Sequence, residues 1–326
     1  MDNTKSMASK SFRRIGFSLF VIAVLTSGLQ ALLVLLPDAL SVSSGTLWSS
    51  GWYTWLITFL PLYVVAIPVG IWIMKKLPRD HRDAIPLGGK NFFLFLLMCF
   101  PLMYGGSLIG TLLSSLLSGG TATNGLLNYT FDDNPLKIIV MVILAPLLEE
   151  FLFRKQLIDR TARYGEKQAI LFSALAFGLF HMNLYQFFYT FGLGLLFGYV
   201  YTRTRRLRYS VIMHMVINFM SSVLVPFLLS KVGTDTFMQI AAGELDDSAL
   251  LALLPDMAGF MLYVLALLGL SIAGLVVLIV KAPKLVFLPA SEELPKEERF
   301  KSIYCNVGVV LFILLCVVFF VLNLIQ

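Results

Sequence analysis

A group of ionisable and polar residues lies between positions 146 and 218, in sequence that is otherwise apolar. Side chains of these types are costly inside a membrane, so their concentration in an apolar chain indicates a functional site. They occur in three short patterns: Glu149-Glu150-x-x-x-Arg154, Phe177-x-x-x-His181 and His214-x-x-x-Asn218.

These side-chain types suit hydrolysis of a peptide or related bond. A carboxylate can act as a general base toward water, and a histidine can share that water or donate a proton to the leaving amine. A histidine and an amide together can donate hydrogen bonds to a developing oxyanion. A carboxylate and two histidines could instead bind zinc and leave one position for water. The residue types leave both mechanisms open, although the His-Glu-x-x-His pattern of soluble zinc peptidases is absent.

A helical hairpin is predicted to bring the first two patterns together. The helix that begins near residue 137 is expected to continue to about 163, and Gly165 is typical of the position after a helix end. A second helix then begins near Lys167. Glu149 precedes Gly165 by 16 residues and His181 follows it by 16. At ~1.5 Å per residue both lie about 24 Å from the turn, so an antiparallel pair of helices places them at the same level.

Helical spacing distinguishes the two adjacent acids. Glu150 and Arg154 are four residues apart and share a helix face, so we expect them to pair. Glu149 is rotated by ~100° from Glu150 and is free to face the interior. A Glu–Arg pair alone could simply fix a helix end.

The same spacing links the remaining site residues in pairs. His214 and Asn218 share one helix face, and Phe177 can form a wall beside His181. A single membrane histidine could be a packing residue. Two adjacent acids, two histidines and an asparagine together favour a site over packing.

Composition places the chain among polytopic helical membrane proteins. Of its 326 residues 58% are hydrophobic and only 13% are charged, with a mean hydropathy of +0.84. The predicted fold is an all-α transmembrane bundle of about eight to nine helices. The candidate spans are 15–37, 53–74, 92–117, 137–153, 168–181, 186–202, 210–230, 258–280 and 303–325.

The whole chain, 1–326, is interpreted as a single integral membrane domain. The catalytic core is expected at about 137–230, with flanking helices at 15–117 and 258–325. Within this core, Gly194-x-x-x-Gly198 indicates close approach of another helix.

The basic residues indicate how the bundle is oriented. With the N-terminus inside, all but Lys137 and Lys231 of the 25 Lys and Arg residues lie in inner segments. This predicts a multi-pass protein of the cell membrane, with a cytoplasmic N-terminus and an extracytoplasmic C-terminus. His214 follows the inner arginine cluster at 203–208 closely, so the site is expected in the cytosolic half. The net charge of +6 is therefore topological, and no nucleic-acid partner is expected.

The three patterns, in this order on membrane helices, resemble the signature of the CPBP family. This family of intramembrane proteases is also called the CAAX-processing and bacteriocin-processing, or ABI, family. The resemblance covers about 70 residues, and each pattern is weak by itself. It implies an intramembrane endopeptidase that hydrolyses peptide bonds of membrane-associated peptides or proteins by water activated by glutamate and histidine.

The resemblance also implies roles for individual residues. Glu149 matches the glutamate that activates water, with His181 assisting it, and His214 and Asn218 match the pair that stabilises the oxyanion. Supporting positions are Glu150, Arg154 and Phe177. The family is commonly called metalloprotease, but a metal-free glutamate mechanism has been argued for its prenyl-protein peptidases. We favour no metal; if zinc is bound, its ligands are Glu149, His181 and His214.

The expected partners are the lipid bilayer and a peptide or protein substrate that approaches from the membrane or from the cytosol. Bacterial relatives are linked to peptide maturation, bacteriocin self-immunity and membrane signalling. An alternative is a non-proteolytic membrane immunity or scaffold protein that keeps the pocket for binding. A transporter is less favoured, because its polar groups would spread along a path.

Overall fold

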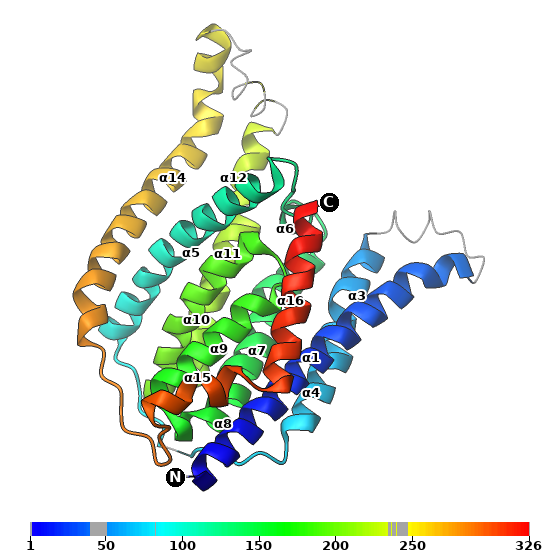
Figure 1. Ribbon diagram of the computed structural model, residues 1–326. Coiled ribbons are helices and arrows are strands. Elements are labelled where there is room, and N and C mark those ends of the chain that lie inside the picture. Colours follow the sequence, from blue (N-terminus) through cyan, green and yellow to red (C-terminus); the bar gives the residue numbers. More distant parts are fainter. Residues whose placement is uncertain are drawn as a thin grey trace.

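The computed structural model describes residues 2–39, 51–81, 83–233, 236, 239 and 247–325. In this part of the chain every regular element is a helix, which confirms the predicted all-α bundle (Figure 1). Several helices join end to end into longer rods. The elements are α1 (Asp2–Ala39), α3 (Trp52–Leu60), η1 (Pro61–Ala66), α4 (Ile67–Met74), α5 (Gly89–Ser118), α6 (Leu126–Thr130), η2 (Ile138–Leu144), α7 (Ala145–Glu150), η3 (Phe151–Ile158), α8 (Asp159–Thr161), η4 (Ala162–Tyr164), α9 (Glu166–Phe180), α10 (Leu184–Thr204), α11 (Leu207–Phe219), η5 (Met220–Leu224), α12 (Val225–Val232), α14 (Asp247–Lys281), η6 (Ala282–Lys284), α15 (Lys296–Tyr304) and α16 (Val307–Ile325).

Six helices of the described residues are long and apolar enough to cross a membrane. The rod at 138–164, α9 and α10 are not among them, so the predicted total of eight or nine crossings stays a prediction. The six are Thr4–Pro37, Trp52–Met74, Gly89–Ser118, Leu207–Val232, Met257–Lys284 and Val307–Ile325.

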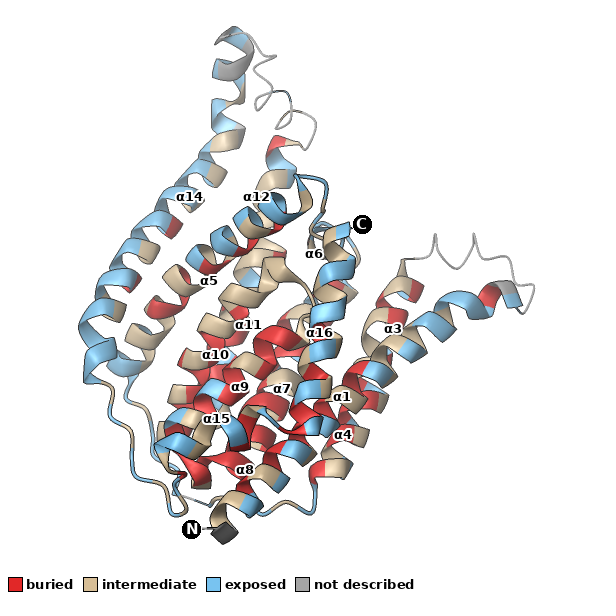
Figure 2. Ribbon diagram, viewed as in Figure 1, coloured by how far each residue is buried: buried red, intermediate tan, exposed pale blue. Residues whose placement is uncertain are grey.

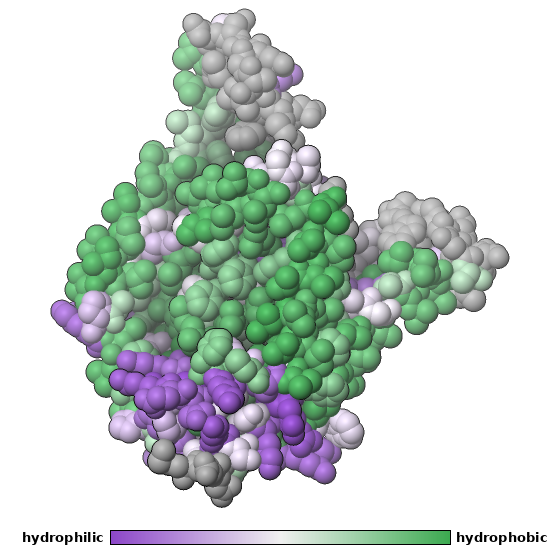
Figure 3. Space-filling view, in the orientation of Figure 1, coloured by the Kyte–Doolittle hydropathy of each residue, from purple (hydrophilic) through white to green (hydrophobic). Residues whose placement is uncertain are grey.

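The bundle has an apolar body and one polar end. Hydrophobic surface covers the helices, and hydrophilic residues gather at the end near the N-terminus (Figure 3). The C-terminus lies away from this polar end (Figure 1). Buried residues are concentrated in the central helices, including α7, α8 and α9, while α14 is largely exposed (Figure 2). The protein is therefore a multi-pass membrane protein with its best-packed region next to its polar end.

Three of the π-helical segments end two residues before a proline. These segments are η1, η2 and η5, and the prolines are Pro68, Pro146 and Pro226. Proline has no N–H and its ring clashes with the carbonyl of the preceding turn, and a wider turn relieves that clash. The fourth segment, η3, contains no proline and begins directly after the two acids. π-Helical turns inside α-helices frequently lie at functional sites.

The predicted hairpin is present. The rod that begins at η2 runs through η4, and the chain turns at Gly165, whose φ of 137° lies in the region that favours glycine. The second arm, α9, begins at Glu166 and packs against η3. Backbone hydrogen bonds from Glu292 and Leu294 to the carbonyls of Arg163 and Tyr164 hold a distant segment against this turn.

The glycine pattern on α10 packs as predicted. A Cβ atom on Gly194 would lie 2.9 Å from the Cα atom of Ala174 on α9, and one on Gly198 would lie 3.2 Å from Ile170. These two glycines therefore allow α10 to approach α9 closely. The hairpin carries the first two polar patterns, and α10 packs against its second arm.

Candidate active site

Glu150 and Arg154 form the buried ion pair that their spacing predicts. Oε2 of Glu150 accepts from Nε of Arg154 at 3.0 Å, and Oε1 accepts from Nη2 at 3.3 Å, with both side chains fully buried. The third guanidinium nitrogen, Nη1, donates to Oγ of Ser173 on α9 at 3.0 Å. The guanidinium also lies 4.8 Å from the centre of the Phe177 ring. Such a pair is stable in the interior because its remaining hydrogen-bonding groups are also satisfied.

Glu149 has a different environment from its neighbour. Its side chain keeps 16% of its surface exposed, whereas that of Glu150 keeps none. Oε1 of Glu149 accepts a hydrogen bond from the hydroxyl of Tyr63, on η1, at 3.2 Å. No ion pair with Lys or Arg involves Glu149 within the described residues, so its carboxylate is the more available of the two.

His214 lies between the two acids. Its Nδ1 atom is 3.3 Å from Oε1 of Glu150, and its Nε2 atom is 3.9 Å from Oε2 of Glu149. The ring is buried and is flanked by the rings of Phe177 and Phe197, with centroids at 5.9 and 5.7 Å. An ionised carboxylate can only accept a hydrogen bond, so Nδ1 is the atom that donates to Glu150. The sequence patterns did not predict this contact with Glu150.

His181 is the C-cap residue of α9 and is held in one orientation. Its Nδ1 atom lies 2.8 Å from the carbonyl oxygen of Phe177. A carbonyl can only accept, so Nδ1 carries the proton and the lone pair of Nε2 is free. The Phe177 ring packs edge-on against His181 at 4.9 Å, which makes it the wall that the spacing predicts. Within the described residues no hydrogen bond or ion pair joins Glu149 directly to His181, so their predicted common level stays a prediction.

Asn218 and His214 both contact the rod that begins at η2. Asn218 meets it at η2, whereas His214 meets it further along, at α7. Its Nδ2 atom donates to the carbonyl oxygen of Met141, on η2, at 2.8 Å. The second hydrogen of this amide group is not used by any hydrogen bond among the described residues. The predicted role of Asn218 as an oxyanion donor stays a prediction.

The site lies toward the polar end of the bundle. His214 follows Leu207, the first residue of α11, by seven residues, which corresponds to about 10 Å along the helix. At that end Arg205 pairs with Asp80 at 3.2 Å and with Asp159 at 3.1 Å. The prediction that this end is cytosolic remains a prediction.

The three side chains considered for zinc do not form a ligand set in this arrangement. Within the described residues, no group of three or more His, Cys, Asp or Glu side chains is placed to hold a metal ion together. Nδ1 of His181 is engaged by a backbone carbonyl and Nδ1 of His214 by Glu150. These bonds leave Nε2 of each ring as the atom that could bind a metal ion, since metal-binding histidines commonly donate their other ring N–H to a carbonyl or a carboxylate.

The three sequence patterns did not identify some polar residues in and near this site, because these residues belong to no short pattern. Tyr63 comes from a rod 86 positions before Glu149, and Ser173 orients Arg154 from α9. Asn183, Gln186 and Tyr189 form a hydrogen-bonded row on the first turns of α10, with contacts of 2.6 and 2.8 Å. Three polar side chains directly after His181 in an apolar region were the available signal for this row.

Comparison with known proteins agrees with the three patterns. Residues 132–220, which contain all of them, match the family model described as type II CAAX prenyl endopeptidase Rce1-like. Over 87 residues the chain is 34% identical to the "Putative membrane peptidase YdiL" of Bacillus subtilis (strain 168). The central segment of this chain is therefore similar to these two membrane peptidase groups, in agreement with the resemblance of its three patterns to the CPBP family.

The family match is confined to this segment. The alignment with YdiL covers 26% of this chain, and the chain spans 35% of the length of that relative. No solved structure matches the chain. The helices outside 132–220 are therefore described from this structure alone.

Proposed function

We propose that this protein is an intramembrane endopeptidase that hydrolyses peptide bonds in membrane-associated peptides or proteins. The observation that carries the proposal is that two adjacent acids have different partners and different exposure. Arg154 pairs with the fully buried Glu150, while Glu149 stays partly exposed, with Nε2 of His214 at 3.9 Å from its carboxylate. The match of the surrounding segment to CAAX prenyl endopeptidases supports the same reaction class.

In the proposed first step, Glu149 acts as general base. A water molecule between its carboxylate and Nε2 of His181 gives a proton to Glu149 as its oxygen attacks the carbonyl carbon of the scissile bond. The second hydrogen stays on the attacking oxygen and donates a hydrogen bond to Nε2 of His181, because Nδ1 of that ring already donates to Phe177. Tyr63 holds the carboxylate in place through its hydroxyl.

In the second step the tetrahedral intermediate collapses. The unused amide hydrogen of Asn218 donates to the oxyanion, and Nε2 of His214 donates with it when both ring nitrogens carry protons. The C–N bond then breaks, and the proton held by Glu149 passes to the leaving amine. The products are a carboxylic acid and an amine, and Glu149 is again ionised.

We propose that this reaction uses no metal ion. All steps above are assigned to side chains that the chain itself supplies. The substrate reaches the site from the membrane or from the polar end, which we propose to be cytosolic, with the N-terminus inside and the C-terminus outside.

A non-proteolytic immunity or scaffold role is the second candidate. The buried hydrogen-bonded network of Glu150, Arg154, Ser173 and His214 is also what a rigid structural element would require. A transporter is less well supported, because the polar groups meet at one level of the bundle.

Three variants distinguish catalysis from scaffolding. The proposal predicts that Glu149→Gln, His181→Ala and His214→Ala each abolish cleavage while the protein still inserts and folds. Full biological activity in all three variants would contradict the proposal and favour the scaffold. Thermal unfolding of each purified variant serves as the control for folding.

A further inference from the structure

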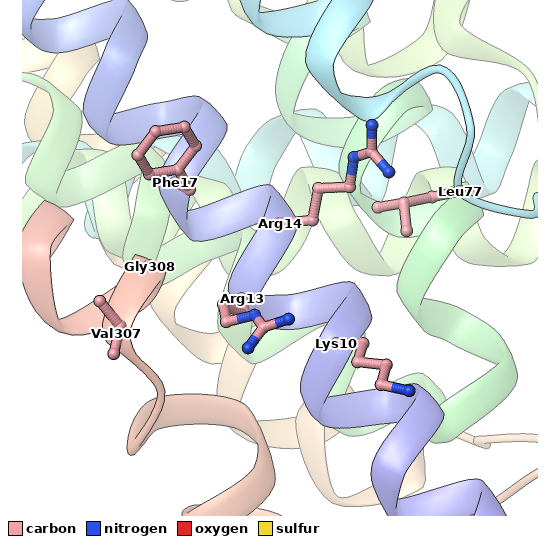
Figure 4. Close-up of a pocket in the computed structure, with 7 residues that line it drawn as sticks. All are labelled: Lys10, Arg13, Arg14, Phe17, Leu77, Val307 and Gly308. Carbon is pink, nitrogen blue, oxygen red and sulfur yellow. The ribbon is translucent and has the colours of Figure 1, made fainter.

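A second polar feature lies on the opposite side of the hairpin from α10, at the polar end. A cavity of about 460 Å³ is lined by Lys10, Arg13 and Arg14 of α1, together with residues of α16 and of the loop after α4. Figure 4 shows the three cationic side chains projecting from α1, with Leu77 on one side and Val307 and Gly308 on the other. None of these residues takes part in the candidate active site.

The charge of this cavity is not neutralised by the protein. Other basic residues at this end are paired with acids, such as Lys5 with Glu298 and Arg163 with Glu292. Within the described residues no ion pair is formed by Lys10, Arg13 or Arg14. Arg14 donates from Nε to the carbonyl oxygen of Ile73 at 2.6 Å, which fixes its stem and leaves its two terminal nitrogens for a ligand. Three cations on one helix face, with room between them, fit an anion such as a phosphate group.

The position of the cavity points to a lipid as the source of that phosphate. Two candidate membrane spans leave the apolar part of the bundle here: α1, whose apolar run begins directly after Arg14, and α16, which begins at Val307. Phe17 and Val307 line the cavity and are exposed, at 44% and 68% of their surface. A phospholipid presents the same sequence of groups, with a phosphate at the interface and apolar chains next to it.

We infer that this cavity binds the phosphate of an anionic phospholipid, whose acyl chains lie along Phe17 and Val307. The bound lipid joins α1 to α16, which already meet at a close crossing where Gly16 faces the backbone of Gly308 and Val309. The site stands apart from the proposed peptidase chemistry and does not depend on it.

Native mass spectrometry of the full chain tests this inference with phosphatidylglycerol and with phosphatidylcholine of the same acyl chains. The double variant Lys10→Gln, Arg13→Gln removes two cations and keeps the packing of Arg14. Its matched control, Lys281→Gln, Lys284→Gln, removes two exposed lysines that end α14 and η6, far from this cavity in the sequence. Thermal unfolding checks that both variants fold.

We expect the wild-type chain to bind phosphatidylglycerol in preference to phosphatidylcholine. Each Lys or Arg near a membrane surface contributes about fivefold in affinity, so the first variant loses roughly twenty-five-fold and the control less than about threefold. Equal losses in both variants, or equal binding of the two lipids by the wild type, would overturn the inference. Displacement of phosphatidylglycerol by millimolar inorganic phosphate would show that free phosphate, and not a lipid, occupies the cavity.

Discussion

Nδ1 of His214 lies 3.3 Å from Oε1 of Glu150, so the buried ion pair of the hairpin extends to a third helix. This contact ties α11 to the rod that carries both acids. It also presents Nε2 of the same ring toward Glu149, at 3.9 Å. The histidine therefore links the structural acid to the proposed general base.

The first prediction concerns the stability of this network. Arg154→Met leaves Glu150 buried without its cation, and we expect it to lower the free energy of unfolding by about 3 to 5 kcal/mol. Lys155→Met is the matched control, because Lys155 also pairs four residues away, with Asp159, but from a side chain that is 41% exposed. Loss of that surface pair should cost no more than about 1 kcal/mol. Equilibrium unfolding in mild detergent measures both, and equal costs would contradict the account of the buried pair.

The second prediction concerns Tyr63. Tyr63→Phe removes the hydroxyl that donates to Glu149 and keeps the ring, which stacks on Phe59 with centroids 5.8 Å apart. We expect kcat to fall about tenfold with little change in KM, since a hydrogen bond to a charged group is worth about 1.5 kcal/mol or more. Tyr129→Phe is the control, because it removes a hydroxyl that bonds to Thr58 in the same aromatic cluster. A similar fall in both variants would assign Tyr63 a packing role only.

The sequence was sufficient to predict the local geometry of the site. Residues four apart on one helix, and residues equidistant from Gly165, have relations that follow from helix dimensions alone. The ion pair of Glu150 with Arg154 and the wall formed by Phe177 are of this kind, and the structure contains both.

Contacts between distant rods could not be predicted in this way. Tyr63 reaches Glu149 from another rod, and its rotation depends on the π-helical turn of η1, whose extra residue shifts every later side chain around the helix. The approach of His214 to Glu150 likewise depends on how α11 packs against α7. Helix spacing gives the face of a residue but not the neighbour that this face meets.

The third prediction tests the packing of α9 against α10. Gly194→Ala places a methyl group 2.9 Å from the Cα atom of Ala174, and this overpacking should cost about 1 to 3 kcal/mol. Gly192→Ala meets its nearest neighbour, Leu102, at 3.4 Å, so the higher helix propensity of alanine should stabilise it by up to about 1 kcal/mol. Thermal unfolding should therefore shift in opposite directions. Destabilisation by both changes to the same extent would contradict the close crossing of these two helices at Gly194.

The fourth prediction concerns metal. The metal-free proposal predicts that purified, active protein contains far less than one zinc per chain and that chelators leave its activity unchanged. Elemental analysis and an activity assay with a chelator measure these two quantities. Stoichiometric zinc that is lost in His214→Ala would overturn the metal-free mechanism and support Glu149, His181 and His214 as ligands.

The central claim is that Glu149 activates the water that cleaves a membrane-associated substrate. Glu149→Gln keeps the size of the side chain and its contact with Tyr63 but removes the base. The most direct measurement is comparative proteomics of membranes that contain either the wild-type protein or this variant at equal abundance. We predict that at least one peptide or protein accumulates uncut with the variant and is cleaved with the wild type. Identical peptide profiles, with cleavage retained by the variant, would contradict the claim.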